Sequence, residues 1–412
     1  MFILFLLVYN LIWLVLLILS FPYYVYLLFK GKSGKLLNRF GIFSCTEKEY
    51  IWLHAASVGE VKIALAFIDE IRTSSMETVL LTVQTDAGYE LANKSLPINT
   101  RLSYVPFDFF VIHYLLLYFI KVKKFIVIET EIWPSLYASC IFERVPIYMI
   151  NARISDKSFP KYLKFKFILS KILPRVLKIF SQTKEYKNRF VALGADQRSI
   201  EIIPNMKYDL IKLSKETKQY FIDSKVFTAA SIRSPEEIYV IETFKKLQEE
   251  FPNLLCIIAP RHLENVEKIE NILKKENLAY QKYSKTGFDN LNTKILIIDQ
   301  MGVLIEAYKN SDVVFVGGSL VNKGGQNILE PAALGKPVIF GKFMSNFKEE
   351  SKVLLENNSA IQIDSEELLV ETVKSLFLDQ VKCDNLGLNA IGALENQSGS
   401  IKKIKESIFG RY

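Results

Sequence analysis

The chain has 412 residues, which at roughly 100–200 residues per domain predicts two globular domains. Half of the residues are hydrophobic, 23% are charged and 13% are aromatic, a composition that excludes disordered and fibrous proteins. The net charge of +8 is concentrated in residues 1–209, which hold 26 Lys+Arg and 17 Asp+Glu, whereas the remainder holds 26 and 27. We therefore expect the first half to face an anionic partner.

The first 29 residues contain no charged side chain. At about 1.5 Å per helical residue, Met1–Ser20 is long enough to span the hydrocarbon core of a bilayer. The basic residues that follow are Lys30, Lys32, Lys35 and Arg39, with no acidic residue among them. By the positive-inside rule we expect a single-pass anchor that leaves the rest of the chain in the cytoplasm. A cleaved signal peptide is the alternative, but no basic residue precedes the apolar stretch.

From Tyr50 onward, short β-branched runs alternate with helical patterns, which is typical of doubly wound α/β domains. The strands expected in the first half are Ile51–Ala55, Thr78–Thr82, Phe125–Glu129, Pro146–Ile150 and Ile179–Gln182. Those expected in the second half are Phe227–Ala230, Leu254–Ala259, Lys294–Ile297, Val313–Val316 and Pro337–Phe340. The polar stretch Asn205–Lys225 is the expected linker. This pattern predicts two Rossmann-like domains that face a cleft, with ligands bound at the carboxyl ends of the strands.

Two stretches of the first half combine apolar and basic residues. Phe109–Lys124 reads as a nearly unbroken apolar helix that ends in three lysines, and Lys157–Lys178 interleaves seven basic residues with aliphatic and aromatic ones. Taken alone, either stretch is equally well interpreted as a buried helix or a solvated basic helix with no role at a membrane. Beside an N-terminal anchor, we expect both to face an anionic membrane surface or the acceptor. Nucleic acid is not an expected partner, because no recognised binding module accompanies the charge.

Carboxylates follow two of the expected strands in the first half. Ser57-x-x-Glu60 forms a capping box ahead of a helix, and the same Glu60 would lie at the mouth of the cleft, where a helix N-terminus also attracts anions. Glu129 and Glu131 follow the next such strand and would either bind sugar hydroxyls, support a base or cap a helix. The sequence alone does not distinguish between these catalytic, binding and helix-capping roles.

The second half has a glycine-rich turn, Gly317-Gly318-Ser319, directly after a strand. Backbone amides in such a turn are suited to holding a phosphate, and the carboxylate of Glu330, about a dozen residues on, is suited to ribose hydroxyls. Arg233 and Arg261 each follow another strand and place a guanidinium at the cleft edge. A helix-capping turn with a surface glutamate is the alternative.

Several kinds of chemistry are disfavoured by what the sequence lacks. The cysteines (Cys45, Cys140, Cys256, Cys383) and histidines (His54, His113, His262) are scattered and show no zinc-site spacing. No Asp-x-Asp, P-loop or Gly-x-Ser-x-Gly occurs, and no Gly-x-Gly-x-x-Gly follows the first strand. We therefore expect neither a metal site nor a bound cofactor.

Taken together, the segments resemble the 3-deoxy-D-manno-octulosonic acid (Kdo) transferases of lipopolysaccharide synthesis. The similar segments run in family order over nearly the whole chain after the apolar segment. They are His54–Glu60, Glu129–Pro134, Asn151–Ser155, Asn205–Asp209, Pro260–His262, Met301–Gly302 and Gly317–Pro337.

The resemblance implies a GT-B enzyme that moves Kdo from CMP-Kdo to a tetra-acylated lipid A precursor at the inner membrane, with inversion and without a metal. It implies that Glu60 is the catalytic base, with Glu129 or Glu131 and Lys207 near the acceptor and donor. The residues it places on the CMP-binding side are Arg233, Arg261, Met301, Gly302, Gly318, Ser319, Asn327 and Glu330. The expected segments are an anchor (1–29), an acceptor domain (30–209), a CMP-Kdo domain (210–385) and a C-terminal helix returning to the acceptor domain (386–412).

The chain departs from the family pattern at three places. Gln326 and Ile328 stand where the family usually has His and Pro, Pro204 stands where it has Gly, and Tyr208 where it has Phe. Gln326 still forms hydrogen bonds but carries no charge. Two alternatives remain: a membrane-associated GT-B transferase with another nucleotide sugar, and a non-catalytic tethered protein that binds nucleotides or lipid. The motifs do not determine how many Kdo residues are added.

Overall fold

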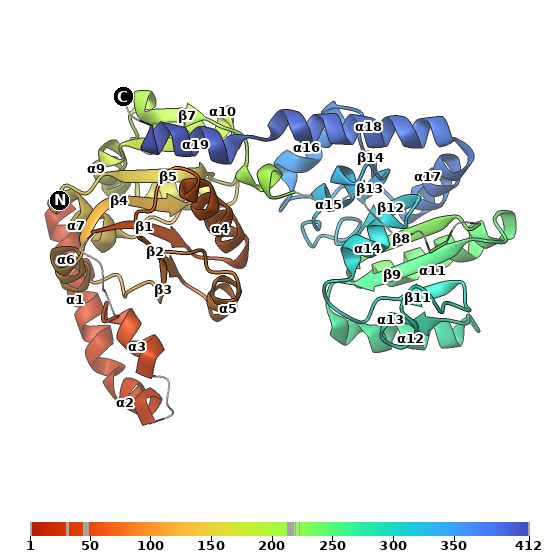
Figure 1. The fold of residues 1–412 in the computed structure, drawn as a ribbon, viewed down its shortest axis with the longest axis horizontal. Coiled ribbons are helices and arrows are strands. Elements are labelled where there is room, and N and C mark those ends of the chain that lie inside the picture. Colours follow the sequence, from red (N-terminus) through yellow and green to blue (C-terminus); the bar gives the residue numbers. More distant parts are fainter. Residues whose placement is uncertain are drawn as a thin grey trace. The chain divides into compact units, whose positions relative to one another are not determined.

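The computed structural model describes residues 2–29, 33–43, 49–211, 218, 220–221 and 223–410, which divide into two compact units (Figure 1). Unit 1 comprises Met1–Leu210 and Ser398–Tyr412, and unit 2 comprises Ile211–Gln397. The linker expected at Asn205–Lys225 starts before the boundary between the units, which lies after Leu210. Its first part forms the 3₁₀ turn η3 (Met206–Leu210), in which Met206 and Tyr208 are buried in unit 1.

Unit 1 is built on seven parallel strands. In chain order they are β1 (Glu49–Ala55), β2 (Val79–Val83), β3 (Thr100–Tyr104), β4 (Lys121–Ile128), β5 (Ile147–Ala152), β6 (Lys178–Ser181) and β7 (Ile200–Ile202). Their order across the sheet is β3-β2-β1-β4-β5-β6-β7, so that β1 lies between β2 and β4. The direction of winding reverses between β1 and β4, and ligands of such sheets bind at the carboxyl ends of the strands at this switch point.

The helices of unit 1 include those that cover the two faces of this sheet. In chain order they are α1 (Phe2–Leu19), α2 (Phe21–Phe29), α3 (Ser33–Arg39), α4 (Val58–Arg72), α5 (Asp86–Lys94), α6 (Phe110–Phe119), α7 (Pro134–Phe142), α8 (Phe159–Lys164), α9 (Lys166–Ile172), α10 (Lys184–Ala192) and α19 (Ser400–Phe409), with the 3₁₀ turns η1 (Leu173–Arg175) and η2 (Gln197–Ser199). The central strands are buried on both faces, which explains their continuous apolar sequence.

The helix expected over Phe109–Lys124 is wrong in its last five residues, 120–124. The apolar helix α6 ends at Phe119, and the three lysines begin strand β4. Lys121 and Lys123 form ion pairs with Glu49, and Lys123 also pairs with Glu77. Because these partners come from distant parts of the chain, local sequence could not indicate them, and these lysines form the polar amino end of a buried strand.

Unit 2 repeats the architecture. Its strands are β8 (Val226–Ile232), β9 (Leu255–Pro260), β10 (Gln281–Lys282), β11 (Ile295–Ile297), β12 (Val313–Val316), β13 (Val338–Gly341) and β14 (Ile361–Ile363). They are parallel in the order β10-β11-β9-β8-β12-β13-β14, and the switch point lies between β8 and β12. Its helices are α11 (Glu236–Glu250), α12 (Val266–Lys275), α13 (Tyr283–Thr286), α14 (Leu304–Lys309), α15 (Leu329–Ala333), α16 (Lys348–Glu356), α17 (Glu366–Leu378) and α18 (Gln380–Gln397), with the turn η4 (Leu263–Asn265).

The C-terminal residues are shared between the units. Helix α18 belongs to unit 2, and the chain then returns to unit 1, where α19 packs beside α4 and η3 (Figure 1). The carboxylate of Asp209 accepts hydrogen bonds from the amides of Gly399 and Ile401, so it caps the start of α19. Ile404 and Ile408 of α19 are buried in the core of unit 1.

The N-terminal segment is helical, as expected. Among the described residues, α1 is the one helix that is long and apolar enough to cross a membrane. The expected basic flank lies partly outside the described residues, at Lys30 and Lys32, and continues in α3 with Lys35 and Arg39.

Candidate active site

Glu60 lies directly beyond the carboxyl end of β1, at the switch point of unit 1. Ser57 caps α4: its hydroxyl accepts a hydrogen bond from the Glu60 amide at 3.3 Å. The carboxylate of Glu60 folds back, accepting from the Ala56 amide and the Ser57 hydroxyl, each at 2.8 Å. The expected capping box therefore forms, except that the amide it satisfies is that of Ala56 and not of Ser57.

The Glu60 carboxyl is buried, with 6% of the residue exposed. Burial raises its pKa above the usual range, the negative charge of Glu129 raises it further, and the hydrogen bonds and Arg153 oppose the shift. A carboxyl whose pKa moves toward neutral pH is a better general base, because it binds a proton more strongly in the transition state.

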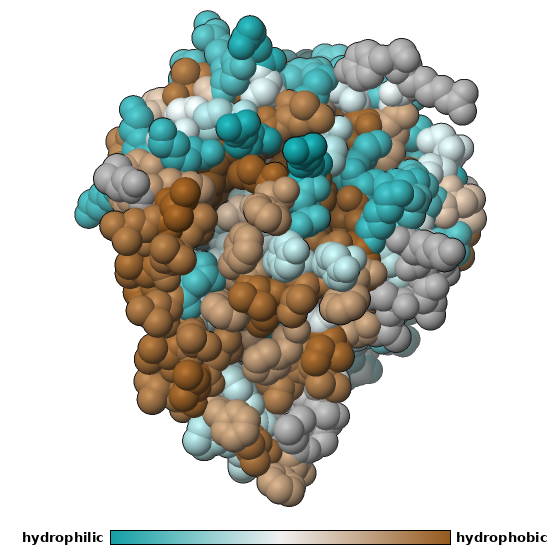
Figure 2. Space-filling model, turned by 90° about the vertical axis from the view of Figure 1, so that its left-hand side faces the viewer, coloured by the Kyte–Doolittle hydropathy of each residue, from teal (hydrophilic) through white to brown (hydrophobic). Residues whose placement is uncertain are grey.

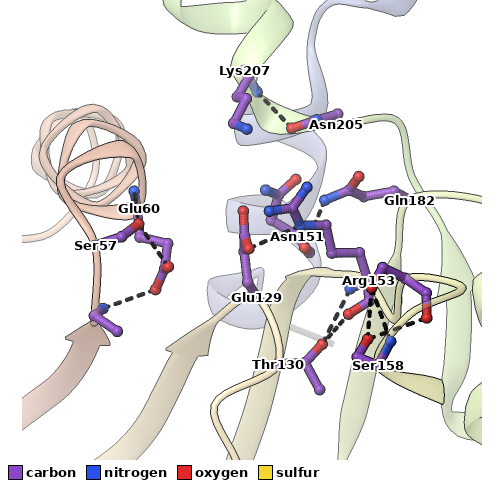
Figure 3. Close-up of polar contacts among 12 residues, drawn as sticks. Ser57, Glu60, Glu129, Thr130, Asn151, Arg153, Ser158, Gln182, Asn205 and Lys207 are labelled. Atoms are coloured by element: carbon purple, nitrogen blue, oxygen red, sulfur yellow. Dashed lines mark hydrogen bonds and ion pairs between the residues drawn. The ribbon is translucent and has the colours of Figure 1, made fainter. Parts of the chain in front are cut away.

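Glu129 follows β4 on the other side of the switch point. Its backbone adopts a φ of 60°, a strained conformation for a residue with a side chain. Its carboxylate accepts from Nε of Arg153 at 2.9 Å, and Thr130 joins the same segment through a hydrogen bond with the Arg153 amide at 3.3 Å. The ends of β4 and β5 are thus linked, and Figure 3 shows Glu60 and Glu129 facing the same space.

Glu131 completes a group of three acidic residues. Burial raises its pKa to about 7, with smaller contributions from the charges of Glu60 and Glu129. A cluster of three carboxyls, in which the pKa values of Glu60 and Glu131 are raised and one arginine lies alongside, forms a site suited to taking a proton from a hydroxyl.

Lys207 is placed on the same side by a polar network (Figure 3). Asn151, in β5 with a φ of 54°, accepts a hydrogen bond from the Met206 amide at 3.0 Å through its side chain. Its backbone carbonyl accepts from the Gln182 side chain at 2.8 Å, and the Asn205 side chain accepts from the Lys207 amide at 3.1 Å. This network fixes η3, and with it the base of the Lys207 side chain.

In unit 2, the turn after β12 already holds an anion, which is the carboxylate of Glu236 at the start of α11. It accepts hydrogen bonds from the amides of Gly318 at 2.6 Å, Ser319 at 3.0 Å and Leu320 at 3.0 Å, and from the Arg233 amide at 2.8 Å. The Ser319 hydroxyl donates to the Val316 carbonyl and accepts from the Gly341 amide at 2.8 Å.

The expected contact of Gly318 and Ser319 with a phosphate therefore does not match the structure. Their amides and the serine hydroxyl are engaged by the protein, and Ser319 has no exposed surface. The glycine-rich sequence indicates a turn whose amides hold an anion. It does not indicate which anion, because Glu236 lies more than 80 residues away along the chain. Gly317 fits this arrangement, since a Cβ there would lie 2.5 Å from Ile232 Cα and 2.7 Å from the Glu236 carboxylate.

Arg233 lies at the switch point of unit 2, between β8 and α11. Its side chain and that of Gln326 lie against Gly318, where an added Cβ would meet Gln326 Nε2 at 3.1 Å and Arg233 Cγ at 3.4 Å. Nε of Arg233 is buried and has no hydrogen-bond partner among the described residues. The side chains of Arg233 and Gln326 therefore both lie against Gly318, and Gln326 is one of the residues at which the chain departs from the family pattern.

The remaining expected donor-site residues lie on neighbouring loops of unit 2. Arg261 follows β9, is exposed, and its amide donates to the Ile232 carbonyl at 3.0 Å, which ties it to the end of β8. Met301 is 74% exposed, and Gly302, with a φ of 87°, ends the same turn. Asn327 accepts from the Leu329 amide at 3.1 Å and so begins α15, which carries Glu330 in its first turn.

Comparison with known proteins gives a family for both units. Residues 34–210 match the family model for 3-deoxy-D-manno-octulosonic-acid transferase (kdotransferase), and residues 236–392 match glycosyl transferases group 1. A 3-deoxy-D-manno-octulosonic acid transferase of Haemophilus influenzae is 31% identical over 383 residues, which are 90% of each chain. The chain belongs to the Kdo transferase family. It is accordingly a glycosyltransferase.

Other similarities are partial or concern the fold. A bifunctional glycosyltransferase/methyltransferase of Fusobacterium nucleatum is 38% identical over 347 residues, which are 80% of this chain but only 53% of that relative. A UDP-GlcNAc 2-epimerase of Neisseria meningitidis, solved with UDP-GlcNAc, has a TM-score of 0.60 at 13% identity and covers 88% of this chain and 100% of its own. At that identity the likeness concerns the fold, and it confirms the expected GT-B class.

Within this Kdo transferase fold, the expected residues fall into two groups. Unit 1 brings together Glu60, Glu129 and Glu131, and unit 2 places Arg233 beside the Gly318 turn. Sequence reasoning assigned no role to Arg153 or Glu236. Arg153 lies in the segment Asn151–Ser155 at the end of a strand, and this position could have indicated a role in the site. Glu236 has no such indication, because an acidic residue in the first turn of a helix is common. Among the described residues, no group of three or more His, Cys, Asp or Glu is placed to hold a metal ion.

Proposed function

We propose that the protein transfers Kdo from CMP-Kdo to a hydroxyl of a tetra-acylated lipid A precursor at the cytoplasmic face of the inner membrane, with inversion and without a metal. The observation that carries the proposal is Glu60, a buried carboxylate with a raised pKa at the switch point of a Kdo transferase fold. Family membership supports the sugar, and the absence of Asp-x-Asp from the sequence supports metal independence.

In this mechanism the Glu60 carboxylate accepts the proton of the acceptor hydroxyl. The hydroxyl oxygen attacks the anomeric carbon of Kdo as the bond from that carbon to the CMP phosphate oxygen breaks. The electron pair of the broken bond leaves with CMP, and Arg233 and Arg261 stabilise the negative charge that grows on the phosphate. Proton transfer to a positioned base contributes typically about 10²–10⁴-fold in rate.

The other residues of unit 1 have supporting roles. The pair Glu129–Arg153 sets the charge beside Glu60, and Lys207, on η3, provides a cation for the carboxylate or phosphate of the substrates. In unit 2, the Gly318–Ser319 turn has a structural role. The cytidine and ribose are held by the loop residues Met301, Gly302 and Asn327 and by Glu330 in the first turn of α15.

The test is the reaction with defined substrates. Detergent-solubilised full-length protein is incubated with tetra-acylated lipid A precursor and freshly made CMP-Kdo, and the lipid is weighed by mass spectrometry. We expect an increase by one or more Kdo units, inhibited by excess CMP but not by UDP. An unshifted lipid, or inhibition by UDP in place of CMP, would exclude CMP-Kdo as the donor.

A further inference from the structure

Helix α1 has one continuous inner face. Its half-buried residues recur every three or four positions, which is the spacing of a single helix face. They are Phe2, Phe5, Leu6, Tyr9, Asn10, Trp13 and Leu17. No residue of α1 is fully buried, so the opposite face is open along the whole helix.

The polar residues of this inner face complete two other helices. The Asn10 side chain accepts hydrogen bonds from the Phe110 amide, which starts α6, at 2.7 Å and from the Ser135 hydroxyl at 3.3 Å. The Tyr9 hydroxyl donates to Asp108 at 2.8 Å. The Asp108 carboxylate, on a residue only 2% exposed, accepts from the amides of Ser135 at 3.2 Å and Leu136 at 2.8 Å. Asn10 therefore caps α6, and Tyr9 orients the carboxylate that caps α7.

Aromatic contacts extend from one end of the segment to the other. Phe5 meets Phe167 of α9 edge to face, with ring centroids 5.9 Å apart. Trp13 lies 5.8 Å from Phe107, and Tyr24 of α2 lies 5.9 Å from the same ring. The N-terminal segment is thus packed along unit 1 from its first turn to beyond its last.

A membrane-crossing orientation conflicts with these contacts. An 18-residue helix is about 27 Å long, so Tyr9 and Asn10 would lie near the centre of a hydrocarbon core ~30 Å thick. They would carry the Asp108 carboxylate and the start of α7 to that depth. A crossing α1 would also place its two ends on opposite sides of the bilayer. The exposed lysines beside Phe167, near one end, would then be separated by the membrane from the basic residues of α3, near the other. Charged groups within the core are costly.

We propose that α1 does not cross the bilayer but lies in its surface as part of unit 1, with both of its ends on the cytoplasmic side. Its open face provides a broad apolar surface, which Figure 2 shows as the brown area over α1 and α2. The exposed residues of α1 include Ile3, Leu4, Leu7, Leu11, Ile18 and Leu19, each at least 60% exposed. Tyr118, Phe119 and Phe142 of α6 and α7 are exposed as well.

The occupant of this surface is a leaflet of anionic phospholipid. Exposed basic residues accompany the apolar ones on α8 and α9, at Lys161, Lys164, Lys166 and Lys171. An apolar helix face inserted at the headgroup level, with lysines beside it, is the arrangement by which in-plane helices bind anionic membranes. The inference does not depend on which sugar is transferred.

Topology measured in sealed membranes tests the orientation. Full-length protein with a protease-cleavable tag at each end is expressed, and inside-out inner-membrane vesicles are treated with protease without detergent. We expect both tags to be removed, because both ends lie on the exposed cytoplasmic side. Protection of the N-terminal tag until detergent is added, with removal of the C-terminal one, would show a crossing helix and overturn the proposal.

A matched pair of substitutions tests the docking of α1. Asn10→Leu removes the cap of α6, and Leu11→Asn places a polar group on the open face, where Leu11 is 60% exposed. We expect N10L to lower the Tm of the detergent-solubilised protein by several degrees, and L11N to leave the Tm unchanged but weaken binding to vesicles of phosphatidylglycerol. A Tm for N10L equal to wild type would contradict docking, and neither readout requires sugar transfer.

Discussion

At the scale of single residues, the site in unit 1 depends on the balance of charge around Glu60. Burial and the charge of Glu129 raise the pKa of Glu60, while Arg153 lowers it. Arg153 also forms an ion pair with Glu129 at 2.9 Å, so the same guanidinium interacts with two carboxylates. The base is therefore adjusted by a residue that need not touch the acceptor.

Replacing Arg153 should change the pH dependence of the reaction. Glu60 acts as a base only when deprotonated, so the rate rises with pH through its pKa. In Arg153→Gln the cation is lost and the charge of Glu129 is no longer opposed, so the pKa of Glu60 rises. We expect the acid limb of kcat/KM against pH to move to higher pH, and Arg153→Lys to move it less. An acid limb unchanged in R153Q would show that Arg153 does not act through Glu60.

Glu131 should affect stability in a defined pH range. Its pKa is about 7 in the folded protein against an ordinary value of 4.5, so the folded state binds more protons than the unfolded state between these values. The free energy of unfolding should fall as pH rises through that range, and less steeply in Glu131→Gln. Urea unfolding at pH 5 and pH 8 compares the two proteins. Identical slopes would contradict a raised pKa at Glu131.

At the scale of elements, Glu236 joins the start of α11 to the turn after β12. Burial raises its pKa and four backbone amides oppose that shift by hydrogen bonding to the charged form. Donors arranged for an anion are satisfied here by the protein itself. Arg233 is held at the same point, since its amide is one of the four donors.

Removing this carboxylate should destabilise unit 2. Glu236→Ala leaves four amides without their acceptor, and we expect the free energy of unfolding to drop by at least about 2–4 kcal/mol, with a raised KM for the donor. Glu242→Ala is the control, because it removes an exposed ion pair with Lys245 on the same helix and should cost less than about 1 kcal/mol. Equal stability of the two variants would mean that the amides find other partners.

Much of the element pattern could be predicted from local sequence. Val313–Val316 is a strand with the expected bounds, because four consecutive apolar residues ahead of a glycine turn allow few alternatives. The strand Thr100–Tyr104 was missed, since its polar and charged residues show no buried run. The position of Glu60 in a helix cap could be predicted, because its partner Ser57 is three residues away. The partners of Glu129 and of the Gly318 turn could not, because they lie far away along the chain.

At the scale of the whole molecule, the two ends of the chain both return to unit 1. Helix α19 packs beside α4 and η3, the elements that carry Glu60 and Lys207. Lys405 of α19 lies 3.6 Å from Glu70 of α4, and Lys178 donates to the Ser407 hydroxyl at 2.7 Å. Helix α19 therefore stabilises the positions of α4 and η3, which carry Glu60 and Lys207.

The cap at Asp209 should control this return. Asp209→Ala removes the acceptor of the Gly399 and Ile401 amides, so α19 should open more often. We expect faster proteolysis near residue 398 and reduced transfer activity. Asp196→Ala, which removes a cap on the exposed turn η2, serves as the control. Unchanged protease resistance in D209A would show that hydrophobic packing suffices to hold α19.

The role of Glu60 is tested most directly by its own substitution in the transfer assay. Glu60→Ala is compared with wild type for conversion of the lipid A precursor with CMP-Kdo, with circular dichroism and CMP binding measured on the same samples. We expect a fall in turnover of about 10²–10⁴-fold with fold and CMP binding retained, because the base is lost and the donor site is not. Turnover near that of wild type would contradict Glu60 as the base.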